Sequence, residues 1–204
     1  MGISERKERE RQEMRAKIID AAIGMFLTEG YEKTSIRNIA EKIEYSPATI
    51  YLYYKDKDEL LYEVQKQAFE KLEETFDREV TSTHPFERLT QLCKSYVRFG
   101  RANPEMYDLM FMIKAPMNCV EAEDGWDNNS DSFMLLLNTL KECMEHGLIR
   151  FKDPMVAALS VWAMGHGLVS LDVSCRLKAM QIDEHMLVQL TEASIDQYLE
   201  LIKS

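Results

Sequence analysis

The sequence has few residues that break helices or crosslink chains: eight Gly, five Pro and four Cys among 204 residues. The cysteines are far apart and include no CxxC pair, so we expect neither a disulfide framework nor a zinc ribbon. We predict buried thiols without a chemical role, since a redox or metal sensor needs two of them to meet in the folded chain. The cysteines are Cys93, Cys119, Cys143 and Cys175.

Long apolar runs are also missing. We find no apolar stretch of the roughly eighteen residues needed to span a bilayer, and the densely charged N-terminus lacks the apolar core of a secretory signal. Arg6 stands where a myristoylation signal would have Ser or Thr. The chain is 46% hydrophobic and 29% charged, which is typical of a globular protein. We expect a cytoplasmic location without membrane contact.

Motifs for catalysis and metal binding are absent as well. The sequence contains no nucleophile elbow, P-loop, HExxH or dinucleotide fingerprint. The four histidines lie far apart, and none forms a pair spaced for metal ligation. We therefore predict no catalytic residue, no metal site and no cofactor, and an enzyme is the least favoured class.

Negative charge predominates, but it is unevenly distributed. The formal net charge is −10, whereas residues 1–57 hold 11 of the 25 basic and 10 of the 35 acidic residues. The N-terminal part is thus close to neutral and the remainder is strongly acidic. DNA would repel the acidic part, so this asymmetry would orient the chain with its N-terminal part toward a polyanion.

Helical periodicity fills nearly the whole sequence, which predicts an all-α fold of about nine helices. Four prolines directly follow a capping residue, a signal for a helix start. We expect an N-terminal helix-turn-helix domain over residues 1–57 and a helical-bundle domain over 58–204, with 114–129 as a loop or lid. The expected helices are 4–29, a short one after Thr34, another from Ser46, and then 56–80, 85–101, 104–113, 130–146, 153–177 and 182–202.

The most informative stretch, residues 34–55, reads TSIRNIAEKIEYSPATIYLYYK. Its two short helices cannot bury their apolar faces alone, and packing them steeply against helix 4–29 makes a helix-turn-helix. The second helix would present small and aromatic polar residues to the major groove. Its expected contact positions are Ser46, Pro47, Ala48, Thr49, Tyr51 and Tyr53.

Residues at the starts of neighbouring helices are placed to contact phosphate. Free amides and basic side chains combine there. The N-terminal arm is also basic, but acidic residues are interleaved with it, and we interpret it as a solvated helix face. The candidate phosphate contacts are Thr34, Ser35, Arg37, Lys55 and Lys57.

The stretch from Ile18 to Leu61 resembles the DNA-binding domain of the TetR (tetracycline repressor) family. The shared features are AA..MF..EG, T.S...IA and S.ATIY.YYK.K.EL, with their mutual spacing. The resemblance implies a homodimer that binds a palindromic operator through the positions named above. Tyr53-Tyr54 replaces the His-Phe of many relatives, and Ala48 replaces a common glycine. For Tyr54 we expect a core position.

The C-terminal half resembles, more loosely, a subclass of this family marked by Trp and His-Gly. The matching pieces are YVRFGRANPEMYDLMF (96–111) and GLIRFKDPMVAALSVWAMGHGLVSL (147–171). The resemblance implies a cavity for a small-molecule effector and a dimer interface built from the last two long helices. Small residues and leucines in 153–177 also suit such an interface, although an intramolecular core helix would show the same pattern.

Thirteen methionines and several aromatic residues favour an adaptable apolar pocket in this half. Core packing is the alternative for each of them, and a hydrogen-bonded core histidine is the alternative for His166. The candidate effector contacts are Phe99, Tyr107, Met110, Phe111, Trp126, Phe133, Leu137, Trp162 and His166.

These observations predict a transcriptional repressor that a small apolar or amphipathic effector releases from double-stranded operator DNA. The two recognition helices of a dimer would lie about 34 Å apart, and helix 56–80 would transmit the effector's influence to them. Two alternatives stay open: a helical regulator without an effector, whose C-terminal core is filled, and an activator.

Overall fold

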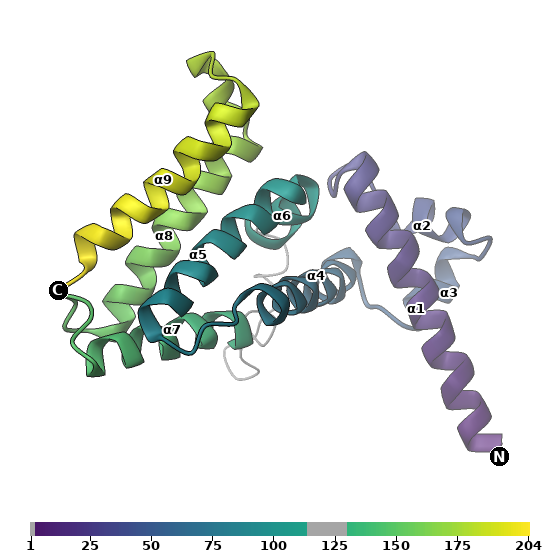
Figure 1. The fold of residues 1–204 in the computed structure, drawn as a ribbon. Helices are drawn as coiled ribbons and strands as arrows, with labels where there is room; N and C mark the ends of the chain where they lie inside the picture. The colour runs from purple at the N-terminus through teal and green to yellow at the C-terminus, as the bar shows by residue number, and fades with distance from the viewer. Residues whose placement is uncertain (1–2, 114–129) are drawn as a thin grey trace. The chain divides into compact units, whose positions relative to one another are not determined.

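The computed structural model describes residues 3–113 and 130–204, and its named elements are all helical (Figure 1). For these residues the prediction of an all-α fold with about nine helices is confirmed. Residues 114–129, predicted as a loop or lid, lie outside the described part. The helices are α1 (Ile3–Glu29), α2 (Ile36–Lys42), α3 (Pro47–Tyr51), α4 (Lys57–Glu79), α5 (Pro85–Ala102), α6 (Pro104–Phe111), α7 (Ser130–Glu145), α8 (Pro154–Val173) and α9 (Glu184–Ile202), with a 3-10 turn at Arg176–Met180.

Capping residues fix the helix ends. The Ser46 hydroxyl accepts a hydrogen bond from the Thr49 amide at 3.3 Å, and the Asp153 carboxylate accepts from the Met155 amide at 2.8 Å. Each side chain accepts a hydrogen bond from an amide of the first helical turn, where the amides lack the i−4 carbonyl partner of the helix interior. Gly30, with a φ of +86°, follows the end of α1, a backbone conformation that favours glycine.

Helix α8 ends four residues before the predicted Leu177. The Ser174 hydroxyl donates to the Ser170 carbonyl at 2.6 Å, and Cys175 adopts a left-handed φ of 58°. A side chain that bonds to the backbone in this way competes with helix continuation. The chain turns there, before α9.

The chain forms two compact units. One contains the described residues of Met1–Ala68 and Glu105–Asn128, and the other those of Phe69–Pro104 and Asn129–Ser204. Helix α4 contributes its first half to the first unit and its second half to the second, without an interruption.

The core of the first unit holds its short helices in place. Helices as short as α2 and α3 are not stable alone, so their buried isoleucines must pack against neighbours. Tyr54 belongs to this core, as expected from the sequence. The core residues include Ile18, Ala22 and Phe26 of α1, Ile39 of α2, Ile50 of α3, Leu60, Leu61 and Val64 of α4, and Leu109 of α6.

The second unit is a bundle in which α5, α7 and α8 pack pairwise and α9 packs on α5 and α8. Contrary to our expectation, α8 is long and apolar enough to cross a membrane by length and composition. Its Ala157, Val161 and Val169 are buried in the bundle, and the core helix of a soluble protein passes the same test. The finding is therefore weak evidence for a membrane segment.

The cysteines differ in their environments. Cys93 and Cys143 are buried, and burial raises their pKa values to about 12 and about 11, so both thiols stay protonated and unreactive. Cys175 is exposed, against the prediction of burial, because it lies in the turn after α8. Cys119 lies outside the described residues.

Candidate nucleic-acid interface and ligand pocket

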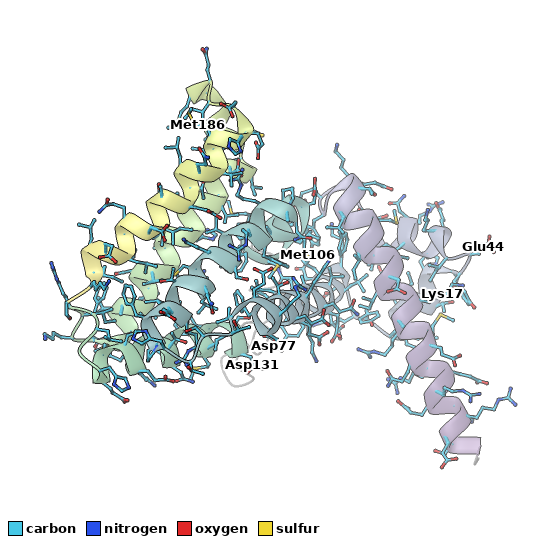
Figure 2. All side chains as sticks on the ribbon, in the orientation of Figure 1. Lys17, Glu44, Asp77, Met106, Asp131 and Met186 are labelled. Atoms are coloured by element: carbon cyan, nitrogen blue, oxygen red, sulfur yellow. The ribbon has the colours of Figure 1, made fainter. Side chains whose placement is uncertain are left out.

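Helix α3 has one buried and one exposed side. Glu44, labelled in Figure 2, adopts a left-handed φ of 64° in the turn before this helix, and the Tyr45 amide donates to the Ala40 carbonyl at 2.9 Å. This turn sets the direction in which α3 leaves α2. Ile50 then anchors α3 in the core, while the side chain of Tyr51 stays 56% exposed.

Most of the predicted DNA contacts lie at the surface around this helix. Ser35 and Ser46 are exposed and cap α2 and α3. Arg37 is exposed and pairs with Glu41 at 3.0 Å, an interaction weak enough for a phosphate to replace. The other exposed positions are Ala48, Tyr51 and Lys55, and the half-buried ones are Pro47, Thr49, Tyr53 and Lys57.

Thr34 is not part of this surface. Its side chain is only 1% exposed, and its hydroxyl donates to the Gly30 carbonyl at 2.9 Å. Sequence reasoning placed Thr34 at a helix start, but Ser35 takes the capping position and turns Thr34 inward. Lys57 also points into the protein, where its ammonium group bonds to two backbone carbonyls.

Near α3 the sequence analysis did not identify two exposed side chains with large apolar surfaces. Leu52 is 77% exposed and directly follows Tyr51, and Tyr45 is also exposed, with the Lys17 ammonium 4.8 Å from its ring centroid. Leu52 follows Ala48 by four residues, so helical spacing could have placed it on the exposed side. Apolar groups at such positions can contact thymine methyl groups.

The N-terminal turns of α1 form a solvated face, as interpreted from the sequence. Arg6 pairs with Glu10 at 2.7 Å and Arg9 with Glu13 at 3.5 Å, both at i,i+4 spacing. These mixed charges offset one another along the helix.

A pocket of about 50 Å³ lies within the second unit. Its polar groups are already paired: the Trp162 indole donates to the Tyr96 hydroxyl at 3.3 Å, and the Ser132 hydroxyl donates to the Glu73 carboxylate at 3.2 Å. An apolar group would therefore lose no hydrogen bond by entering. The lining consists of Leu72 and Phe76 of α4, Leu92, Cys93 and Tyr96 of α5, Ser132, Phe133 and Leu136 of α7, and Val161, Trp162 and Gly165 of α8.

Acidic groups stand beside the pocket. Burial raises the pKa of the Glu73 carboxyl, the hydrogen bond from Ser132 opposes this shift, and the nearby carboxylates of Asp131, Glu70 and Asp77 raise the pKa further. Figure 2 labels Asp131 on α7 and Asp77 on α4. The described lining contains no basic side chain. An anion in this pocket would thus lack a partner and meet like charge.

Two of the nine predicted effector contacts line the pocket. They are Phe133 and Trp162, whose ring centroids are 6.0 Å apart. The His166 ring lies 6.4 Å from that of Trp162 without lining the pocket, and burial lowers its pKa. Phe99 and Leu137 are buried in the same unit. Trp126 lies outside the described residues.

The remaining three, on α6, belong to the first unit. Tyr107 is buried and its ring packs on that of Phe111 at 4.7 Å between centroids, and Met110 is buried as well. The Gln65 amide donates to the Leu109 carbonyl at 2.6 Å, which ties α6 to α4. The contributions of Leu72 and Phe76 were missed, because periodicity identifies buried positions but does not distinguish a core from a pocket.

Among the described residues no group of three or more His, Cys, Asp or Glu side chains is arranged to hold a metal ion. A short capped helix that packs on α2, shares the core with α1 and exposes a polar and aromatic side defines the class of helix-turn-helix DNA-binding proteins. The family model for bacterial regulatory proteins of the tetR family matches residues 18–64, and the model for the tetracyclin repressor-like C-terminal domain matches 89–196. The chain belongs to the tetR family of bacterial regulatory proteins.

Individual relatives agree with this assignment. The HTH-type transcriptional regulator HbdR of Aromatoleum sp. (strain CIB) is 36% identical over 162 residues, a match that covers 76% of this chain and 71% of HbdR. The HTH-type transcriptional repressor KstR of Mycolicibacterium smegmatis is 28% identical over 100 residues, covering 48% of this chain and 49% of KstR. A bacterial regulatory protein in the tetR family from Rhodococcus RHA1 shares the fold, with a TM-score of 0.67, 18% identity and coverage of 92% and 96%.

Proposed function

We propose that this protein is a cytoplasmic repressor that binds a palindromic operator as a homodimer and leaves it when a small apolar or amphipathic effector enters the bundle. Regulators of this family bind operator DNA and act as dimers. The observation that carries the proposal is the exposed side of α3, with Tyr51 in water and Ile50 in the core. The relative KstR, which is named as a repressor, supports repression over activation.

In the proposed complex α3 enters the major groove. Tyr51 and Leu52 would contact base edges and thymine methyl groups, and Ser46 would bond to a base or a phosphate. Ser35, Arg37 and Lys55 would position the helix on the phosphate backbone. Selection of bound sequences from random duplex DNA should recover an inverted repeat with half-sites about 10 base pairs apart. Bound sequences without two-fold symmetry would overturn the operator part of the proposal.

The proposed dimer interface consists of α8 and α9, which pack on one another (Figure 1). Both expose apolar side chains at helical spacing, and the cost of leaving them in water favours a partner surface. An isologous pair of these helices would form a four-helix interface. The exposed side chains are Met155, Val156, Leu159 and Leu171 of α8, and Met186, Val188, Leu190 and Leu201 of α9.

The proposed effector site is the pocket beside Trp162, and the assignment to the Trp and His-Gly subclass is part of this proposal. The pocket favours an uncharged apolar group, since its own polar atoms are paired and carboxylates stand beside it. Ligand pockets usually measure about 300–1,000 Å³, so this one must expand to accept more than a small group. Expansion would move Leu72 and Phe76 of α4, the helix whose Leu60 and Leu61 pack in the first unit.

Filling the pocket should block an apolar ligand. A Cβ on Gly165 would lie 3.3 Å from the Tyr96 ring, whereas a Cβ on Gly167 would meet nothing within 4 Å. The added methyl group takes space that a bound ligand would need, and fitting extra apolar volume into a packed site typically costs about 1–3 kcal/mol. Gly165→Ala should therefore weaken benzene binding roughly tenfold. Gly167→Ala is the matched control because both substitutions bring the same gain in helix propensity. The readout is the shift of the Trp162 indole N–H signal on titration with benzene, in a Trp126→Phe background.

Equal benzene affinities in the two variants would remove the pocket from the proposal. If benzene binds the parent protein but leaves operator affinity unchanged, the pocket is not coupled to DNA binding. That result would favour the second candidate function, a regulator without a small-molecule effector, for which the small pocket volume is the supporting observation.

A further inference from the structure

The connection between α1 and α2 is held by a lysine from α4. The Lys57 ammonium donates to the Tyr31 carbonyl at 2.9 Å and to the Thr34 carbonyl at 3.1 Å. It also lies 3.9 Å from the centroid of the Tyr31 ring. A single cation thus contacts both ends of the turn that leads into α2, and it is itself only half exposed.

The neighbouring residue reinforces this contact. The Tyr31 hydroxyl donates to the carboxylate of Asp58, which follows Lys57 in the first turn of α4. Burial and this hydrogen bond raise the pKa of Tyr31 well above its usual range, so the hydroxyl stays a donor. The other face of the connection is fixed to α1, because the Tyr31 ring packs edge-on against that of Phe26 at 5.4 Å between centroids.

The geometry leaves the Lys57 ammonium little capacity for DNA. An ammonium group has three N–H donors, and two of them are used by the carbonyls. The Tyr31 carbonyl also accepts a backbone hydrogen bond from the Thr34 amide at 3.2 Å. Bonds from a charged donor such as Lys57 are among the stronger hydrogen bonds in proteins. Withdrawing Lys57 to reach a phosphate would break both bonds and the contact with the ring. Lys55, two residues earlier, is exposed, and among the described residues no hydrogen bond joins its ammonium group to the turn.

We propose that Lys57 and Tyr31 form a clamp that fixes the connection Gly30–Ser35 to the first turn of α4, and that Lys57 is a positioning residue and not a phosphate contact. The clamp sets the position of Ser35, the cap of α2, and through α2 that of α3. The first turn of α4 and the helix-turn-helix then move together, which is how a shift of α4 would reach DNA. The DNA-binding part of this inference rests on the proposed function.

The salt dependence of operator binding separates the two roles. A lost phosphate contact lowers the slope of log K against log salt by about 0.9, and each substitution occurs twice in a dimer, so the expected change is about 1.8. Lys55→Met should show that change. Lys57→Met, which keeps the stem and removes the charge, should weaken binding roughly fivefold or more at every salt concentration, with a slope near that of the parent protein. A slope change of about 1.8 for Lys57→Met would overturn the proposal.

Hydrogen exchange of the DNA-free protein tests the clamp independently of any operator. The amides of residues 31–36 should exchange roughly tenfold faster in Lys57→Met than in the parent protein, and Lys55→Met should leave them unchanged. Tyr31→Phe keeps the ring and removes only the bond to Asp58, so amide exchange in the same residues should accelerate by a smaller factor. This second variant keeps the test decisive if Lys57→Met fails to fold. Unchanged exchange in both Lys57→Met and Tyr31→Phe would refute the clamp even if the operator proposal holds.

Discussion

Tyr51→Ala should cost the protein its preference for operator over unrelated DNA. Each major-groove contact contributes about 1–3 kcal/mol of discrimination, and a dimer makes it twice, so operator affinity should fall about 30-fold or more. The side chain is 56% exposed and lies outside the core, so the thermal midpoint should not change. Fluorescence anisotropy at fixed salt, with operator and scrambled duplexes of equal length, measures both affinities.

Tyr51→Phe is the matched variant, because it keeps the ring and removes the hydroxyl. If the ring makes the contact with DNA, the operator affinity of Tyr51→Phe should stay near that of the parent protein. If the hydroxyl makes it, the operator affinity should fall as far as in Tyr51→Ala. Affinity for scrambled DNA should change little in either variant, since that affinity comes from phosphate contacts. An equal loss on both duplexes in Tyr51→Ala would show that Tyr51 contacts the backbone and does not read the sequence.

Leu159→Asp should convert the dimer into a monomer and abolish tight operator binding. Leu159 is 53% exposed on α8, so in the isolated chain the substitution costs little stability. In the proposed interface it would bury an unpaired carboxylate next to its two-fold mate, which is strongly unfavourable. Loss of the second half-site removes the gain from linked binding, and operator affinity should fall about 100-fold or more. Analytical ultracentrifugation measures the mass of the protein in solution, and fluorescence anisotropy measures its operator affinity.

Met134→Asp is the control for this experiment. Met134 is also an exposed apolar residue, 41% exposed, but it lies on α7, outside the proposed interface. The new charge is the same, so a general effect of added negative charge on DNA binding would appear in both variants. A dimeric Leu159→Asp protein with normal operator affinity would rule out α8 as the interface.

Local signals made most of the fold predictable from the sequence. Proline behind a capping residue located the starts of α3, α5 and α8, because their caps satisfy amides within a few residues of the chain. Helix α6 also begins at the predicted proline, but the Asn103 side chain donates back to the Phe99 carbonyl of α5. The end of α8 was predicted too late, since no proline or glycine marks it and the side-chain bond of Ser174 that accompanies the turn leaves no such signal. The core position of Tyr54, expected for a large aromatic residue, is confirmed by its exposure of only 1%.

Long-range packing explains what the sequence did not reveal. Lys57 stands where a phosphate contact is expected, but it bonds to a carbonyl of the connection after α1, more than twenty residues away. Thr34 was missed for a local reason, because its hydroxyl bonds to the Gly30 carbonyl four residues earlier. The α6 aromatics resemble pocket residues, yet α6 joins the first unit, where Gln65 of α4 bonds to the Leu109 carbonyl. Periodicity indicates that a side chain is buried and leaves open what it is buried against.

Methylation interference on the selected operator tests most directly whether α3 reads the major groove. Dimethyl sulfate modifies guanine N7 in the major groove and adenine N3 in the minor groove, so one reaction probes both. We predict that methylated guanines block binding in two clusters whose centres lie about 10 base pairs apart, and that methylated adenines between them do not. Interference confined to adenines, or a single cluster of guanines, would contradict the account.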